Sequence, residues 1–160
     1  MKEDTEEMSS DFDQVMEEMQ AAIIEDARKT YSEEVIQRWI NPRQLGEIRD
    51  PQAYGKVTGP CGDTVKIFLK IEKDRITDAR FLTDGCMTTI AAGCMACELA
   101  IGKIYKEAFT VTKELILEQL GGLPEESTHC ALLASTTLKE ALTDYLTSKN
   151  EPWRRAYKRH

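Results

Sequence analysis

Residues 64–82 have the sequence TVKIFLKIEKDRITDARFL, and the class of fold follows from this segment. Apolar side chains occupy every second position from Val65 to Ile71, which is the pattern of a strand with one buried face. We expect Lys73-Asp74 to turn the chain and Ile76–Leu82 to form the second strand of an antiparallel hairpin. Val57 is expected to begin a third strand at the edge of the same sheet.

The segments around this hairpin have helical periodicity. Helices are expected over residues 31–40, 88–101, 112–120 and 131–147. Residues 41–56 contain two prolines and two glycines and are expected to form a surface loop. Strands followed by helices indicate an α+β fold, with a small antiparallel sheet of about three strands, helices packed on one face and a long C-terminal helix.

The two ends of the chain differ from this domain, which we place at residues 31–149. Residues 1–30 are acidic, and their apolar side chains recur at helical spacing: Phe12, Val15, Met16, Met19 and Ile23. We expect a solvated helix that lies loosely on its own domain, with docking on a partner as the alternative. Residues 150–160 form a basic tail that is expected to be mobile.

The composition disfavours several classes of protein. With 41% hydrophobic residues among 160, the chain can bury the core of one domain. Its formal net charge of −7 gives no attraction to phosphate groups, so we expect no nucleic acid partner. No apolar run approaches the roughly 20 residues of a membrane span, and no secretory signal is visible. We therefore expect a cytoplasmic protein with no membrane contact.

Three of the five cysteines lie at the boundaries of expected elements. Cys61 precedes the hairpin, Cys86 follows its second strand, and Cys130 stands at the entrance to the last helix. Proteins place reactive groups in such loops, and a helix N-terminus lowers the pKa of a thiol. Asp63 lies two residues after Cys61 on an extended segment, so both side chains can point to the same side.

These residues form a set of ligands suited to a soft metal: Cys61, Asp63, Cys86, His129 and Cys130. Three thiolates suit zinc or an iron–sulfur cluster, and a histidine or a carboxylate can fill a fourth position. The spacing is that of neither a zinc finger nor a ferredoxin. The alternative is that all three cysteines are inert, buried side chains.

Five segments between residues 31 and 149 occur in a recognisable order: Tyr31-Ser32-Glu33-Glu34-Val35, Asn41-Pro42-Arg43, Gly59-Pro60-Cys61-Gly62-Asp63, Ala79-Arg80-Phe81 leading to Gly85-Cys86, and His129-Cys130 followed by Leu133-Ala134. In this order, and at these approximate separations, they resemble the IscU/NifU N-terminal family of iron–sulfur cluster assembly scaffolds. Cys-Gly-Asp alone would be a weak motif, but its combination with Gly-Cys and His-Cys is specific.

The resemblance implies a labile 2Fe–2S cluster built on the chain and transferred to apo-protein clients. Sulfur would come as persulfide from a cysteine desulfurase, with iron and electrons from separate donors, so the protein would be a scaffold and not a turnover enzyme. Cys61, Cys86 and Cys130 would be ligands, and Cys130 also the persulfide acceptor. Asp63 or His129 would complete the set, and a carboxylate ligand would keep the cluster labile. Zinc can occupy the same donors in the resting or purified protein.

Two other functions fit the same residues. The first is a zinc-dependent sulfurtransferase resembling SufU, with Zn²⁺ on Cys61, Asp63, Cys86 and Cys130. Two features favour the scaffold. The SufU pattern lacks the histidine found here at His129, and it has a long insertion between its last two cysteines that is missing between Cys86 and Cys130. The second function is that of a structural zinc domain that binds a partner.

The chain departs from the family pattern at three places, one of which is the acidic segment of residues 1–30, which the family core does not require. Cys94 and Cys97 replace small residues; we expect both to be buried thiols, with a redox pair or an auxiliary metal site as the alternative. The loop of residues 123–127 reads LPEES, where IscU proteins carry Leu-Pro-Pro-Val-Lys. A specialised DnaK-type chaperone recognises that family motif, so handover through this chaperone is in doubt.

Overall fold

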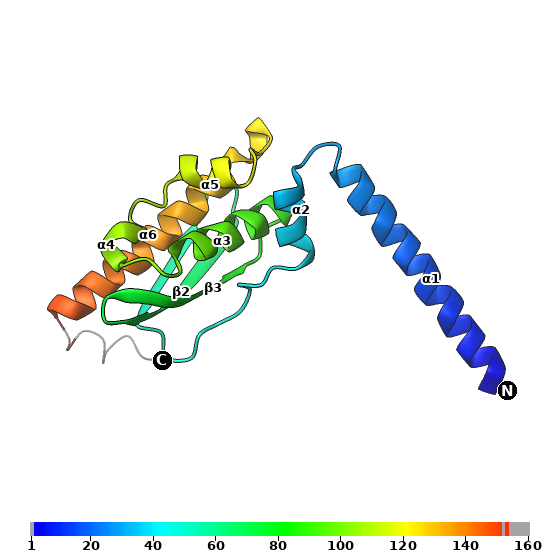
Figure 1. Ribbon diagram of the computed structural model, residues 1–160, viewed down its shortest axis with the longest axis horizontal. Coiled ribbons are helices and arrows are strands. Elements are labelled where there is room, and N and C mark those ends of the chain that lie inside the picture. The colour runs from blue at the N-terminus through cyan, green and yellow to red at the C-terminus, as the bar shows by residue number, and fades with distance from the viewer. Residues whose placement is uncertain (1, 152, 154–160) are drawn as a thin grey trace.

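A three-stranded antiparallel sheet lies at the centre of the fold (Figure 1). The computed structural model describes residues 2–151 and Trp153. The strands, in the order β1-β2-β3, are β1 (Ala53–Thr58), β2 (Thr64–Glu72) and β3 (Arg75–Thr83). The predicted hairpin is confirmed, and Lys73 and Asp74 turn the chain with φ of 52° and 65°. Two such left-handed residues match the twist of the strands that they join.

The edge strand β1 begins earlier than the sequence suggested. Its first residue is Ala53 and not Val57, so it includes residues that we expected in a surface loop. Gly55 explains the difference, because a Cβ at this position would lie 2.5 Å from the Thr137 carbonyl oxygen. This glycine lets β1 approach the last helix closely, and does not mark a loop.

The described residues form six α-helices and one 3₁₀ turn around this sheet. They are α1 (Lys2–Ala27), α2 (Glu33–Ile40), α3 (Met87–Ala100), α4 (Tyr105–Ala108), α5 (Lys113–Gln119), η1 (Glu125–Ser127) and α6 (Thr128–Asn150). The α+β class and the long C-terminal helix are confirmed. The helix α4 and the turn η1 were not expected, and α6 begins three residues before Ala131. Its first turn therefore includes His129 and Cys130.

The core lies between the sheet and helices α3 and α6. Alternate residues of β2 are buried on this side, with 0 to 6% of each exposed: Val65, Ile67, Leu69 and Ile71. Small residues bring α3 close to the sheet, and a Cβ at Gly93 would lie 2.8 Å from the Phe81 ring. The middle of α3 is therefore packed in the core, while its first turn reaches the end of the sheet.

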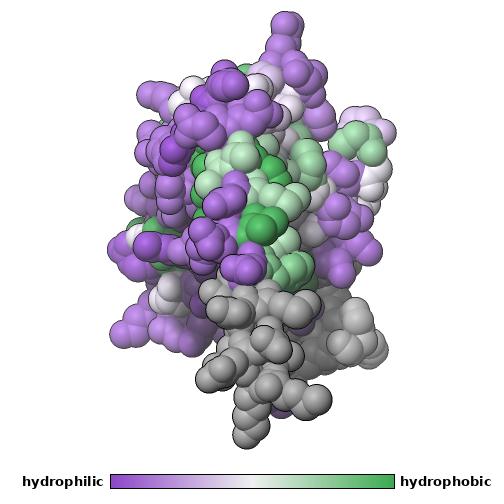
Figure 2. Space-filling model, turned by 90° about the vertical axis from the view of Figure 1, so that its right-hand side faces the viewer, coloured by the Kyte–Doolittle hydropathy of each residue, from purple (hydrophilic) through white to green (hydrophobic). Residues whose placement is uncertain are grey.

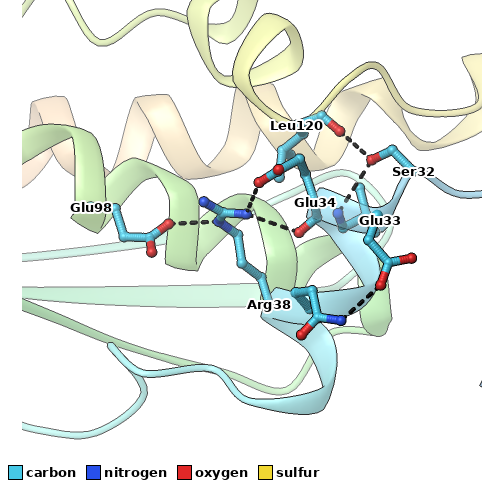
Figure 3. Close-up of polar contacts among 8 residues, drawn as sticks. Ser32, Glu33, Glu34, Arg38, Glu98 and Leu120 are labelled. Carbon is cyan, nitrogen blue, oxygen red and sulfur yellow. Dashed lines mark hydrogen bonds and ion pairs between the residues drawn. The ribbon is translucent and has the colours of Figure 1, made fainter.

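Polar contacts fix α2 to its neighbours (Figure 3). The Arg38 guanidinium donates to Glu98 on α3 through Nε, at 2.6 Å, and to Glu34 through Nη1, also at 2.6 Å. Ser32, which caps α2, donates its hydroxyl to the carbonyl oxygen of Leu120 after α5. A hollow of about 520 Å³ lies beside Arg38, between α2, α3 and α5.

The acidic helix α1 leads away from the body (Figure 1). Its apolar stripe is exposed, from 41% at Met16 to 66% at Phe12, and Figure 2 shows an apolar patch bordered by hydrophilic residues on the side where α1 projects. The helix is confirmed, but its position differs from the expected one on its own domain. The stripe is narrow and lies among carboxylates, whose desolvation would oppose docking.

The remaining predictions concern the membrane and the C-terminal tail. Among the helices of the described residues, none is both long and apolar enough to cross a membrane. The helix α6 ends at Asn150, and Trp153 is 62% exposed. Most of the basic tail at residues 150–160 lies outside the described residues, so its mobility stays a prediction.

Candidate functional site

Three segments that carry predicted ligands meet at one end of the sheet. They are the turn between β1 and β2 with Cys61, the junction of β3 and α3 with Cys86, and the first turn of α6 with Cys130. Side chains beside the strands hold this end together. Asp84 Oδ1 accepts the Thr64 N–H at 2.8 Å, and the Thr83 hydroxyl donates to the Thr64 carbonyl at 2.7 Å.

The turn between β1 and β2 presents Cys61 at the surface. The Gly59 N–H donates to the Asp63 carbonyl at 2.8 Å, and the Gly62 N–H donates to the Gly59 carbonyl at 3.0 Å. Gly62 has a φ of +89°, a left-handed value that favours glycine. The Cys-Gly-Asp motif therefore makes a tight turn with an exposed thiol at Cys61 and a half-buried carboxylate at Asp63.

Cys86 is the N-cap residue of α3, and its thiol is exposed. Its Sγ lies 3.2 Å from the Thr88 hydroxyl. Burial acts to raise the pKa of Cys86, but the Thr88 hydroxyl and the backbone N–H groups of Thr89 and Thr88 outweigh it and hold this pKa below its usual value. The predicted effect of a helix N-terminus is therefore present at Cys86, and it favours the thiolate form.

Cys130 lies in the first turn of α6 but is only 1% exposed. Its Sγ lies 3.3 Å from both the Thr88 and the Thr89 hydroxyl oxygens. Burial raises the pKa of Cys130 in spite of these two hydroxyl groups. Our expectation that a helix N-terminus would lower this pKa is wrong, because packing against α3 removes the thiol from solvent.

Asp63 and His129 complete the arrangement from two sides. The Thr89 hydroxyl lies 3.3 Å from Asp63 Oδ2, so it bridges the carboxylate and the Cys130 sulfur. His129 Nε2 lies 3.7 Å from Cys130 Sγ. The structure therefore connects four of the five predicted residues by direct or threonine-mediated contacts. Cys61 stands at the same end, on the exposed turn.

The donors fit a soft metal or a cluster by their chemical type: three sulfurs, one carboxylate and one imidazole. Within the described part of the chain, no three His, Cys, Asp or Glu side chains converge closely enough to hold a metal ion. Two thiols face solvent and the third is turned inward. Enclosing a cargo would therefore need the Cys130 sulfur to turn outward.

Comparison with known proteins agrees with this arrangement. The family model described as the NifU-like N terminal domain matches residues 30–152. The chain belongs to this NifU-like family. The match covers the whole body from α2 to the end of α6 and leaves out α1, and it confirms the predicted family.

Relatives of this NifU-like domain include named scaffold proteins. This chain is 42% identical over 116 residues to the iron–sulfur cluster assembly scaffold protein IscU 1 of Archaeoglobus fulgidus, with 72% of this chain and 76% of the relative covered. It is 38% identical over 124 residues to the IscU scaffold protein of Azotobacter vinelandii, with 74% and 96% covered. Among solved structures, it is similar to FiSufU from Fervidobacterium islandicum, assigned to cluster assembly in the SUF system. The TM-score is 0.57 at 23% identity, with 70% and 96% covered, which shows the shared fold alone.

Thr88 and Thr89 are the site residues of this NifU-like domain that the sequence reasoning missed. They are 2% and 0% exposed, and their hydroxyls contact Cys86, Cys130 and Asp63. A signal was present, because two adjacent hydroxyl residues directly follow Gly-Cys-Met at the start of an otherwise apolar helix. Buried hydroxyls need partners, and their partners here are the predicted ligands.

Cys94 and Cys97 belong to a different environment. Both lie in the middle of α3 and are buried, at 1% and 0% exposure, as expected. Burial raises the pKa of Cys94, and burial together with the neighbouring Cys94 raises the pKa of Cys97 well above its usual value. A redox or auxiliary metal role has no support in this setting, because thiol reactivity depends on the thiolate and on access.

Proposed function

We propose that this NifU-like domain is a scaffold on which a labile 2Fe–2S cluster is assembled and from which it is passed to apo-proteins. The observation that carries the proposal is the meeting of Cys86, Cys130 and Asp63 around two threonine hydroxyls, with Cys61 exposed beside them. The relatives named IscU scaffold proteins support it. The partners are a cysteine desulfurase, donors of iron and electrons, and apo-protein clients.

Cys130 is the proposed acceptor of sulfur. Its thiolate attacks the outer sulfur of the desulfurase persulfide, forms a new S–S bond and releases the desulfurase thiolate. Two electrons from the electron donor then reduce that sulfur to sulfide and restore the Cys130 thiolate. Because Cys130 is 1% exposed, its sulfur must first turn outward from α3. His129, 3.7 Å away, can follow it as a ligand.

Cys61 and Cys86 are the proposed first ligands for iron. Both thiols are exposed, and the lowered pKa of Cys86 favours the thiolate that binds metal. Asp63 contributes a carboxylate, which is a harder and weaker ligand for a cluster than a thiolate. A site with four thiolates would retain its cluster, whereas this mixed set favours release.

The proposal is tested by anaerobic reconstitution of the full chain with a cysteine desulfurase, cysteine, a reductant and ferrous iron. We expect a visible iron–sulfide chromophore that transfers to an apo-ferredoxin. Cys130→Ser should abolish it, while Cys94→Ser, a matched change at a buried thiol outside the site, should leave it in place. If both variants form the chromophore, or if both lose it, the assignment of Cys130 is contradicted.

The same experiment separates the zinc-dependent alternative. Stoichiometric zinc, no chromophore and faster desulfurase turnover would indicate a sulfurtransferase of SufU type. Tight zinc with no response to the desulfurase would indicate a structural zinc domain. His129 beside Cys130 favours the scaffold among the three. Location in the cytoplasm and handover without the DnaK-type chaperone stay predictions.

A further inference from the structure

Two buried hydroxyl groups join the ligand-bearing segments in the cargo-free chain. Thr88 Oγ1 lies 3.2 Å from Cys86 Sγ and 3.3 Å from Cys130 Sγ. Thr89 Oγ1 lies 3.3 Å from Cys130 Sγ and 3.3 Å from Asp63 Oδ2. The Cys130 sulfur is therefore held between two hydroxyls of α3, although it belongs to α6.

The orientation of these threonines is specific to this place. A threonine inside a helix commonly donates to the carbonyl four residues earlier, and Thr137 of α6 does so, to Leu133 at 2.7 Å. Thr88 and Thr89 lie in the first turn of α3, where the residues four positions earlier precede the helix, and their hydroxyls contact sulfur and carboxylate. Gly85 makes room for this, because a Cβ there would lie 2.6 to 2.7 Å from the side-chain atoms of Thr89.

We propose that Thr88 and Thr89 are positioning residues that hold the Cys130 sulfur in its inward position until sulfur or iron replaces the hydroxyl contacts. The meaning of this hold for cluster assembly rests on the proposed function, whereas the hold itself concerns the cargo-free chain. Cys86 also contacts the Thr88 hydroxyl, but its thiol is exposed, as is that of Cys61. Of the three thiols, only that of Cys130 is buried and lies between both hydroxyls.

The hold determines how often Cys130 is accessible. A reagent in solution reaches the sulfur only in the outward position, where both hydroxyl contacts are already broken. The rate of its reaction therefore follows the population of that position. Removing one hydroxyl should raise this population without changing the outward thiol itself.

Alkylation of the metal-free full chain by an uncharged maleimide, followed by mass spectrometry of each cysteine, measures this directly. In Thr88→Val and in Thr89→Val, which replace a hydroxyl by a methyl of similar size, we expect Cys130 to react about two- to tenfold faster, the range expected for one lost hydrogen bond. Thr88→Ser and Thr89→Ser restore the hydroxyl and should return the rate toward that of the wild type. An unchanged Cys130 rate in both valine variants would overturn the proposal.

Two controls separate positioning from a loss of stability. Thr137→Val removes a buried hydroxyl from α6 away from the ligands, and it should leave the Cys130 rate unchanged. Cys97, which is 0% exposed in the core, reports general opening of the domain. Equal acceleration at Cys97 and Cys130, or no rescue by serine, would also overturn the proposal.

The outcome is independent of cluster formation. If the wild type builds no cluster but the valine variants still expose Cys130, the proposed function fails and the positioning role stands. If the wild type builds a cluster and the valine variants leave Cys130 guarded, the function stands and the positioning role fails.

Discussion

The first turn of α3 and its middle hold cysteines in opposite surroundings. At the first turn, Cys86 is exposed, and hydroxyl and backbone N–H groups hold its pKa below the usual value. In the middle, Cys97 is fully buried, and burial raises its pKa well above that value. The same residue type on one helix is thus a ligand candidate at one point and a core side chain at the other. Exposure and hydrogen-bond donors decide the chemistry of a thiol, and not its presence alone.

Exchanging sulfur for oxygen at each place should give opposite results. Cys97→Ser puts a hydroxyl in the core and should lower the free energy of unfolding by about 1–3 kcal/mol, with cluster formation kept in the folded protein. Cys86→Ser should abolish the chromophore but change the stability by less than about 0.5 kcal/mol, because serine is a good N-cap residue. Chemical denaturation and reconstitution of both variants measure this pair of effects.

If both variants lose the chromophore although the same fraction of each is folded, the proposed difference between Cys86 and Cys97 is contradicted. The middle of α3 would then also contribute to the site. Cys97→Ala, which adds no hydroxyl, shows whether the loss of stability comes from the buried polar group.

Asp63 provides a further test of the difference between the two parts of α3, because its carboxylate contacts the hydroxyl of Thr89 in the first turn. Asp63→Ala should slow transfer of the cluster to an apo-ferredoxin by about two- to tenfold, because softer donors then replace a weak oxygen ligand. Stopped-flow absorption at the cluster band follows this transfer. Asp78→Ala, which removes a carboxylate from β3, is the matched control. Transfer kinetics identical to those of the wild type would argue against Asp63 as the labile ligand.

The smallest effect that we expect is a difference in pH dependence between two neighbouring thiols. Burial acts on both, but at Cys86 the hydroxyl and N–H donors outweigh it and lower the pKa, while at Cys130 burial prevails and raises the pKa. The Cys86 thiolate therefore forms at lower pH than the Cys130 thiolate. Alkylation of the metal-free chain over a pH series should show half-maximal reaction at lower pH for Cys86. If Cys86 and Cys130 show the same pH dependence of alkylation, the expected difference between their pKa values is contradicted.

The hairpin could be predicted because it depends on local pattern, whereas the gathering of the cysteines was implied by the resemblance to the scaffold family. Alternation along β2 specifies the buried face, and cysteines at element ends come together when those ends share one edge of a sheet. The start of β1 could not be predicted, because glycine is typical of loops and the role of Gly55 depends on its contact with α6. The inward position of Cys130 depends in the same way on how α6 packs against α3. The periodicity of α1 indicated which face is apolar, but not whether another surface covers it.

The protruding helix has a consequence for the colloidal behaviour of the protein. Residues 1–30 contain ten acidic and three basic side chains, a balance of −7, so residues 31–160 carry 18 of each sign and are formally neutral. A protein whose net charge is near zero at neutral pH tends to self-associate and precipitate. The acidic helix therefore supplies the electrostatic repulsion that keeps copies apart, and it does so from outside the body, at no cost to the packing of the core.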